Sequence, residues 1–338
     1  MKKSLHTLIT CFSLLLAISP FTNIHADDSL VVYSARSDKF VKPIIAEFTR
    51  QTGIKVTLHS GGATALLNKL KLEGEHSSAD LFLSNDAGTL QRGSELGLFQ
   101  PLPEAMTAPI DARYRAADNT WVGLSARARV LVVNSQGKFA DRIKSVFDLA
   151  DPALKGKLAI THSSNDSFVA GVTVYMQAAG KEKTAQWLKG MKDNVGTEVF
   201  NKHSKIVAAV ANGSKQVGLV NHYYIYRHLD KEPISNIRIV MPDQGADDIG
   251  IAWNVAGIAV TKATHKTQLA EKLVDFLVSD FGQQQFADAN REYPTRTGVA
   301  ANPQLPQANT FRVAKVPMYE LGTLRSATID LIESVGMP

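Results

Sequence analysis

The chain has 338 residues, with 37 Lys and Arg against 32 Asp and Glu, and a formal net charge of +5 at pH 7. This small excess of positive charge forms no basic run, so the composition gives no support to nucleic-acid binding. Cys11 is the only cysteine and lies in the N-terminal segment discussed next, which excludes disulfides, thiolate metal sites and a cysteine nucleophile in the rest of the chain.

The first 26 residues have the pattern of a secretory signal peptide. Two lysines at positions 2 and 3 precede the apolar stretch 8–21, and Ala26 followed by Asp27 suits a cleavage site. The apolar stretch is too short for a membrane span, and no second stretch of spanning length follows. We therefore predict an exported protein that is not embedded in the membrane, with residues 1–26 removed.

Roughly 312 residues then remain, more than one hydrophobic core usually serves, which favours two domains. Apolar side chains recur at helical spacing within residues 38–52, and Gly53 is suited to end that helix. The same reading along the chain predicts strands at 30–33, 54–58 and 80–83 and helices at 38–52, 66–73 and 88–96. Strands that alternate with helices in this way predict an α/β fold with a parallel sheet.

The long extended run at residues 121–134 predicts a strand that crosses into a second lobe. That lobe repeats the alternation, with strands at 157–161 and 217–220 and helices at 167–178, 182–192 and 205–211. The apolar run 251–260 would bring the chain back, and amphipathic helices from Lys266 onward would complete the first lobe. We thus expect a discontinuous first lobe (27–126 and 255–338), a second lobe (127–254) and a hinge of two crossover strands.

Candidate ligand residues follow the predicted strands, because ligands of such sheets bind beyond the carboxyl ends of the strands. Residues 33–36, 84–86 and 221–224 occupy these places. Tyr223 and Tyr224 are the most informative. A phenol has a pKa of about 10, so it is a poor ligand unless a strongly charged cation displaces its proton. Fe(III) is such a cation, and two adjacent tyrosines on a loop could both bind it; packing of the two rings into the core is the alternative.

Five segments together carry a resemblance to a known family. They are residues 33–36 (Tyr-Ser-Ala-Arg), 79–86, 121–129, 218–224 (Gly-Leu-Val-Asn-His-Tyr-Tyr) and 292–294 (Glu-Tyr-Pro). In order and spacing they resemble the ferric-ion-binding periplasmic proteins of bacterial iron ABC transporters, the bacterial transferrin type of solute-binding protein. The resemblance covers the mature chain nearly end to end.

The resemblance implies a two-lobed type 2 periplasmic binding protein, monomeric, that closes over Fe(III) and delivers it to an inner-membrane permease and its ATPase. Tyr223 and Tyr224 would bind the metal. A synergistic anion, carbonate or phosphate, would lie against the start of a helix at Ser164, Asn165 and Ser167, with Asn221 facing it.

This sequence departs from the family at several ligand positions. Relatives carry a histidine near Ser37, a glutamate at Asn85 or a third tyrosine at Ser167. Asp86 is then our predicted third metal ligand, with capping of the following helix as the alternative. Asp166 is unexpected beside a bound anion, which its carboxylate would repel, and capping or metal contact would explain it.

Arg36 and Arg127 are predicted to bind the anion through paired hydrogen bonds, and an interdomain salt bridge is the alternative for both. His203 and His222 are expected behind the ligands, because a ferric site prefers oxygen donors.

Two other functions stay open at this point. The same architecture could bind an oxyanion, a sugar phosphate or thiamine instead of iron. An exported hydrolase is the alternative of another class, although the chain has no Gly-x-Ser-x-Gly, His-Glu-x-x-His, phosphate-loop or dinucleotide-binding motif. We therefore expect a binding protein and no enzymatic activity.

Overall fold

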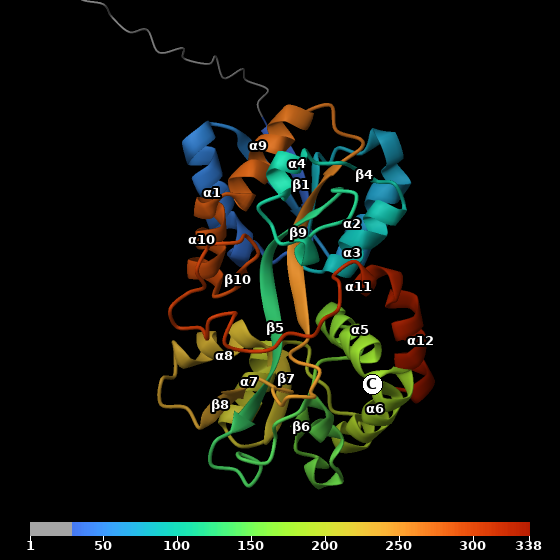
Figure 1. The fold of residues 1–338 in the computed structure, drawn as a ribbon, viewed down its shortest axis with the longest axis vertical. Coiled ribbons are helices and arrows are strands. Elements are labelled where there is room, and N and C mark those ends of the chain that lie inside the picture. Colours follow the sequence, from blue (N-terminus) through green and yellow to red (C-terminus); the bar gives the residue numbers. More distant parts are fainter. Residues whose placement is uncertain (1–28) are drawn as a thin grey trace, which may run out of the picture.

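The computed structural model describes residues 29–338, so the predicted signal peptide lies outside the described residues. These residues form two lobes, one above the other in Figure 1, and two long strands run from one lobe into the other. Helices surround strands in both lobes, which confirms the predicted α/β class. No helix among residues 29–338 has the length and apolar character needed to cross a membrane.

The first lobe is built on the sheet order β2-β1-β3-β9-β5. Its strands β1 (Ser29–Ser34), β2 (Lys55–Ser60) and β3 (Leu81–Ser84) are parallel, and β9 (Trp253–Thr261) runs antiparallel to β3. The helices of this lobe are α1 (Asp38–Thr52), α2 (Ala63–Glu73), α3 (Ala87–Glu95), α4 (Glu104–Thr107), α9 (Thr267–Val278) and α10 (Asp280–Asn290). Helix α1 has the predicted bounds because its apolar residues face the core and Gly53 adopts φ 74° at its end.

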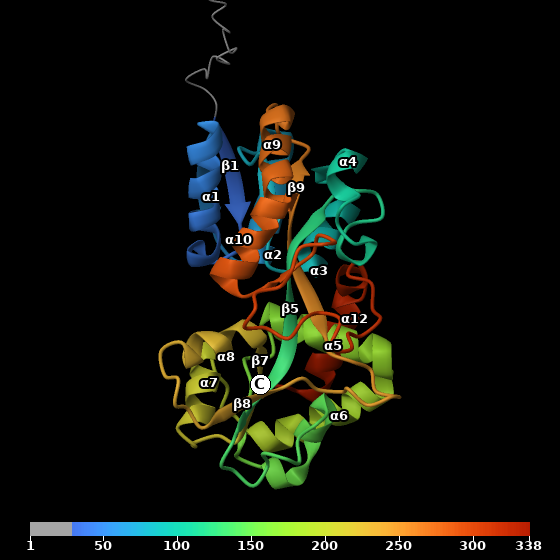
Figure 2. The ribbon, with the colours of Figure 1, turned by 60° about the vertical axis from the view of Figure 1, so that its left-hand side comes forward.

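The hinge consists of β5 (Val122–Asn134) and β9, which confirms the two predicted crossover strands. Residues 122–128 of β5 pair with β9, whereas residues 129–134 pair with strands of the second lobe, β7 (Val217–Asn221) and β8 (Ile237–Val240). Every residue of β5 is buried. One continuous strand therefore belongs to both sheets, and Figure 2 shows it passing between the lobes.

The second lobe contains β6 (Leu158–Ala159) and the helices α5 (Asp166–Ala179), α6 (Lys181–Val195), α7 (His203–Ala211) and α8 (His222–Leu229). One prediction was wrong here. Residues 222–224 are the first turn of α8, which follows β7 directly, and do not form a loop. The short strands β4 (Phe99–Gln100) and β10 (Tyr293–Pro294) join the first-lobe sheet at β9 and β5.

The C-terminal segment contacts both lobes. Helix α11 (Glu320–Thr323) packs against α3, and α12 (Arg325–Val335) packs against α5 and α6. The buried side chains of α12 include Leu331 and Ile332, which gives this contact an apolar core. The expectation that the whole of 255–338 belongs to the first lobe therefore does not hold for α12, because its buried face is covered by second-lobe helices. The remaining lobe boundaries stay a proposal.

Candidate functional site

A cavity of about 160 Å³ lies between the two lobes. The first lobe contributes one wall and the second lobe the other, while Arg127 reaches the cavity from the hinge strand β5. The lining residues of the first lobe are Arg36, Ser37, Phe40, Asn85 and Glu292, and those of the second are Asn165, Asp166, Ser167, His203, Asn221, Tyr223 and Tyr224.

The two predicted tyrosines both line this cavity. They occupy the first turn of α8, and their ring centroids are 4.4 Å apart. Phe40 of the first lobe packs edge-on against Tyr223 at 5.6 Å, and His203 stacks on Tyr224 at 5.0 Å. These contacts fix the orientation of both rings, because each ring is held by a neighbour other than its partner.

The surroundings of Tyr224 oppose the loss of its phenolic proton. Burial raises the pKa of Tyr224 above its ordinary value, and the neighbouring phenol of Tyr223 raises it further. A phenol of this kind binds a metal ion only when the ion is charged strongly enough to displace the proton. The Tyr224 phenol would therefore need a highly charged cation to bind as a ligand.

The first-lobe wall contains a buried network of charges. Arg36 forms a salt bridge with Glu292 at 2.5 Å, and both side chains are almost fully buried. The hydroxyl of Ser125 donates to the same carboxylate oxygen at 2.7 Å and accepts from Arg36 at 3.0 Å. Burial opposes the charge of Glu292, but Arg36 and Arg127 outweigh it and lower the pKa of this carboxyl. Arg36 is thus held in a salt bridge within the first lobe, not between the lobes as the alternative reading had it.

Arg127 lines the cavity from the hinge strand β5. Its guanidinium donates to the backbone carbonyl of Asn85, and burial lowers its pKa. Its role in anion binding stays a prediction. The structure adds the hydrogen bond from Arg127 to Asn85.

The start of helix α5 brings Asn165 and Ser167 together with His203, which was expected behind the ligands. Asn165 caps the helix, and its side-chain oxygen accepts from the backbone N–H of Ser167 at 3.1 Å and from the Ser167 hydroxyl at 2.6 Å. Ser167 also contacts Nε2 of His203 at 3.0 Å. Asn221, at the end of β7, accepts from Arg129 at 3.3 Å.

Ser164 differs from these residues. Its side chain is exposed, bonds to His162 at 2.8 Å and does not line the cavity. The structure therefore does not bring Ser164 to the predicted anion site.

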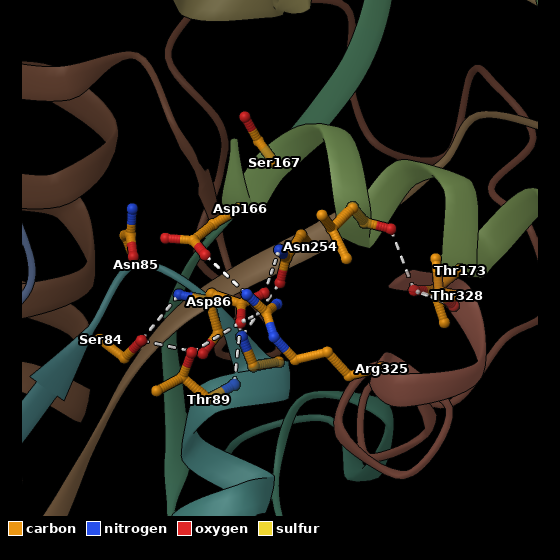
Figure 3. Close-up of polar contacts among 12 residues, drawn as sticks. Ser84, Asn85, Asp86, Thr89, Asp166, Ser167, Thr173, Asn254, Arg325 and Thr328 are labelled. Atoms are coloured by element: carbon orange, nitrogen blue, oxygen red, sulfur yellow. Dashed lines mark hydrogen bonds and ion pairs between the residues drawn. The ribbon is translucent and has the colours of Figure 1, made fainter. Parts of the chain in front are cut away.

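Asp86 is not part of the cavity wall either. Figure 3 shows its carboxylate at the start of α3, where one oxygen accepts from the backbone N–H of Thr89 at 2.8 Å and from the Thr89 hydroxyl at 2.9 Å. The other oxygen accepts from Asn254 at 2.9 Å. Both oxygens thus have protein donors in a buried position, and capping, the alternative to metal binding, describes what this residue does. We therefore correct the predicted ligand set by leaving Asp86 out.

Asp166, unlike Asp86, is a carboxylate that lines the cavity. It is the first residue of α5, and Arg325 donates to it at 2.8 Å. Burial raises the pKa of Asp166, the nearby Asp86 carboxylate adds to the rise, and Arg325 opposes it.

Several lining residues were not assigned to the site from the sequence. Glu292 belonged to one of the family segments, but nothing in its local sequence indicated a cavity position, and Phe40 had the spacing of a core residue. Within residues 29–338, no three His, Cys, Asp or Glu side chains are grouped as a metal site would group them.

Known proteins resemble this chain over nearly its whole length. Residues 43–312 match the family of bacterial extracellular solute-binding proteins. Iron uptake protein A1 of Synechocystis sp. is 32% identical over 312 residues, covering 90% of this chain and 86% of that protein. The Fe(3+)-binding periplasmic protein of Serratia marcescens is 31% identical over 315 residues, covering 92% and 91%.

A solved structure agrees with these relatives. The crystal structure of iron-bound HitA from Pseudomonas aeruginosa superposes with a TM-score of 0.85 at 28% identity, and the match covers 91% of this chain and 99% of that one. The two lobes and the continuous hinge strands described above are thus those of a type 2 periplasmic binding protein. The chain belongs to the family of bacterial extracellular solute-binding proteins.

Proposed function

We propose that this protein binds Fe(III) in the cavity between its lobes and delivers it, in the periplasm, to an inner-membrane ABC permease and its ATPase. One observation carries the proposal: Tyr223 and Tyr224 occupy the same turn of α8 and line the same interlobe cavity. The relatives named above are described as iron uptake and Fe(3+)-binding proteins, which supports the same ligand.

The chemistry of the cavity favours a small, highly charged cation. Fe(III) prefers anionic oxygen donors, and two phenolates supply them once their protons are displaced. Closure of the lobes excludes water, and the lower dielectric constant strengthens the attraction between the ion and the phenolates. A hinge of two strands suits such a closure.

The size of the cavity argues against the larger alternative ligands. Pockets for drug-sized molecules usually measure about 300–1,000 Å³, whereas this cavity measures about 160 Å³. Thiamine and sugar phosphates would need more room than the two walls leave. A small oxyanion fits the volume and could pair with Arg127, which also lines the cavity, so the iron titration below has to distinguish it from Fe(III).

The hydrolase alternative has one suggestive contact, between Ser167 and Nε2 of His203. A Ser–His pair needs a third group that holds the imidazole through its other nitrogen. Nδ1 of His203 is buried without a hydrogen-bond partner among the described residues. The pair thus lacks the orienting group, which supports a binding protein without catalytic activity.

Titration with ferric nitrilotriacetate tests the proposed ligand. The wild type should develop a visible tyrosinate-to-iron charge-transfer band, and Tyr223→Phe or Tyr224→Phe should each weaken Fe(III) binding by at least about a hundredfold, because each removes one anionic donor. Tyr226→Phe is the matched control, since Tyr226 lies on the same helix but does not line the cavity.

A wild type that stays colourless with stoichiometric iron, or cavity tyrosine variants that bind as the Tyr226 control does, would refute the proposed function.

A further inference from the structure

The place predicted for an external anion is already occupied by contacts within the chain. At the start of α5, both the backbone N–H and the hydroxyl of Ser167 donate to the side chain of Asn165. These are the donors that carbonate or phosphate would use at a helix start. An external anion would have to break both hydrogen bonds.

A carboxylate of the protein itself lies between these two residues. Asp166 lines the cavity, so its negative charge is available to an ion bound there. The same charge repels an external anion at this helix start. The residue that seemed out of place for anion binding is therefore well placed for cation binding.

Arg325 holds Asp166 from the side away from the cavity. It stands at the start of α12, donates to one carboxylate oxygen of Asp166 at 2.8 Å and lies 3.5 Å from the capping carboxylate of Asp86. Figure 3 shows Arg325 reaching both acids, while the second oxygen of Asp166 makes no drawn contact. Arg325 itself does not line the cavity. This arrangement fixes one oxygen and leaves the other for a ligand.

The remaining acid of the cavity wall is not available in this way. Glu292 is fully buried, and its carboxylate is engaged by Arg36 and Ser125. Removing it from that salt bridge would leave a buried guanidinium without its counter-charge, which is unfavourable.

We propose that Asp166 is the third anionic protein ligand of Fe(III) and takes the place of the synergistic anion, with Arg325 as its positioning residue. The proposal rests on the proposed function and specifies its ligand set. Two phenolates and one carboxylate then carry three negative charges, equal to the charge of the ferric ion.

The amounts of iron and of external anion in the iron-loaded protein test this proposal directly. Wild type loaded from ferric nitrilotriacetate in phosphate-free, carbonate-depleted buffer, and then desalted, should retain one Fe(III) per chain without stoichiometric nitrilotriacetate, phosphate or carbonate. Asp166→Asn should bind Fe(III) at least about a hundredfold more weakly in that buffer, because an anionic ligand is lost. Added phosphate or bicarbonate should restore much of its affinity and change that of the wild type by less than about twofold.

The restored binding separates a ligand from a residue that only maintains the fold, since a misfolded variant would not recover with an anion. Asp193→Asn is the matched control, because Asp193 is an exposed acid on α6 away from the cavity. Arg325→Gln keeps the carboxylate but not its orientation, and should weaken binding by about 10–100-fold, as for other residues that hold a metal ligand in place.

Two results would overturn the inference and leave the proposed function standing. One is an Asp166→Asn variant that binds as tightly as the Asp193→Asn control in anion-depleted buffer while Tyr223→Phe still loses the colour. The other is a wild type that retains one external anion per iron. If the wild type also stays colourless with iron, the proposed function itself is refuted.

Discussion

Both walls of the cavity contain polar side chains, but the two walls use them differently. In the first-lobe wall, Arg36 and Glu292 are engaged with each other and with Ser125 behind them in a buried network. In the second-lobe wall, Tyr223 and Tyr224 line the cavity from one turn of a helix. Polar groups that are paired with each other cannot lose one partner without cost, whereas groups directed into a cavity are free to bind a ligand.

Under the proposed function, this comparison would place the metal donors in the second lobe and give the first lobe a supporting role. Phe40 of the first lobe contributes by packing against Tyr223. Closure would then bring the Phe40 ring and the Arg36–Glu292 salt bridge over a metal ion that the second lobe binds. Four predictions test this division, from the largest expected effect to the smallest.

Glu292→Gln should have the largest effect on stability. It leaves the buried guanidinium of Arg36 without its counter-charge, and breaking such a pair costs about 3–5 kcal/mol in the free energy of unfolding. Urea unfolding of the iron-free protein measures this. Glu95→Gln, which removes a partner from a surface ion pair on α3, is the control and should cost no more than about 1 kcal/mol. Equal losses in the two variants would contradict the stabilising role of the first-lobe wall.

Iron should stabilise the protein through the second-lobe wall. At a free ligand concentration one hundred times the dissociation constant, binding to the folded state alone adds about 2.7 kcal/mol to the free energy of unfolding. At the same iron concentration Tyr223→Phe should lose nearly all of this gain. Glu292→Gln should retain the gain, although its free energy of unfolding without iron is lower. Thermal unfolding with and without ferric nitrilotriacetate measures both. Retained iron stabilisation in Tyr223→Phe would show that the donors lie elsewhere.

Asp86→Ala should cost about 1–2 kcal/mol, because it removes the cap of α3. Its Fe(III) affinity should remain within about threefold of the wild type, since the Asp86 carboxylate does not line the cavity. Urea unfolding and iron titration of the same preparation separate the two quantities. A large loss of affinity without a loss of stability would restore Asp86 as a ligand.

The smallest effect concerns pH. The pKa of Glu292 lies below its ordinary value of 4.5 in the folded protein, so its contribution to stability is present above that value. The contribution is lost as the pH falls through the lower folded-state pKa. The difference in unfolding free energy between wild type and Glu292→Gln should therefore be constant from neutral pH down to about 5 and shrink only in more acidic solution. A difference that shrinks already near pH 6 would contradict this assignment.

The sequence predicted the elements that local pattern and burial control. Residues 121–134 are almost the whole of β5, and 38–52 are the whole of α1, because a continuous apolar run and a helical repeat ended by glycine each have one favourable structure. Residues 221–224 were misread as a loop, since aromatic residues after a strand have no strong helical preference, and packing in the second lobe decides that α8 begins there.

The candidate site divides in the same way. The Tyr223–Tyr224 pair could be found from the sequence because its two members are adjacent and their chemistry is unusual. Asp86 and Asp166 could not be distinguished, since each is an acid at the start of a helix. The difference between them arises from Thr89, Asn254 and Arg325, whose positions relative to the two acids depend on tertiary contacts.

By itself, then, the amino-acid sequence predicted the class of fold, the two lobes, the crossover strands and the tyrosine pair, through chain length, local pattern and a family resemblance. Only the tertiary structure decided which polar groups are already paired and which line the cavity. Partners such as Arg36 and Glu292 lie 256 residues apart in sequence, and pairing over such a distance is set by the packing of whole elements.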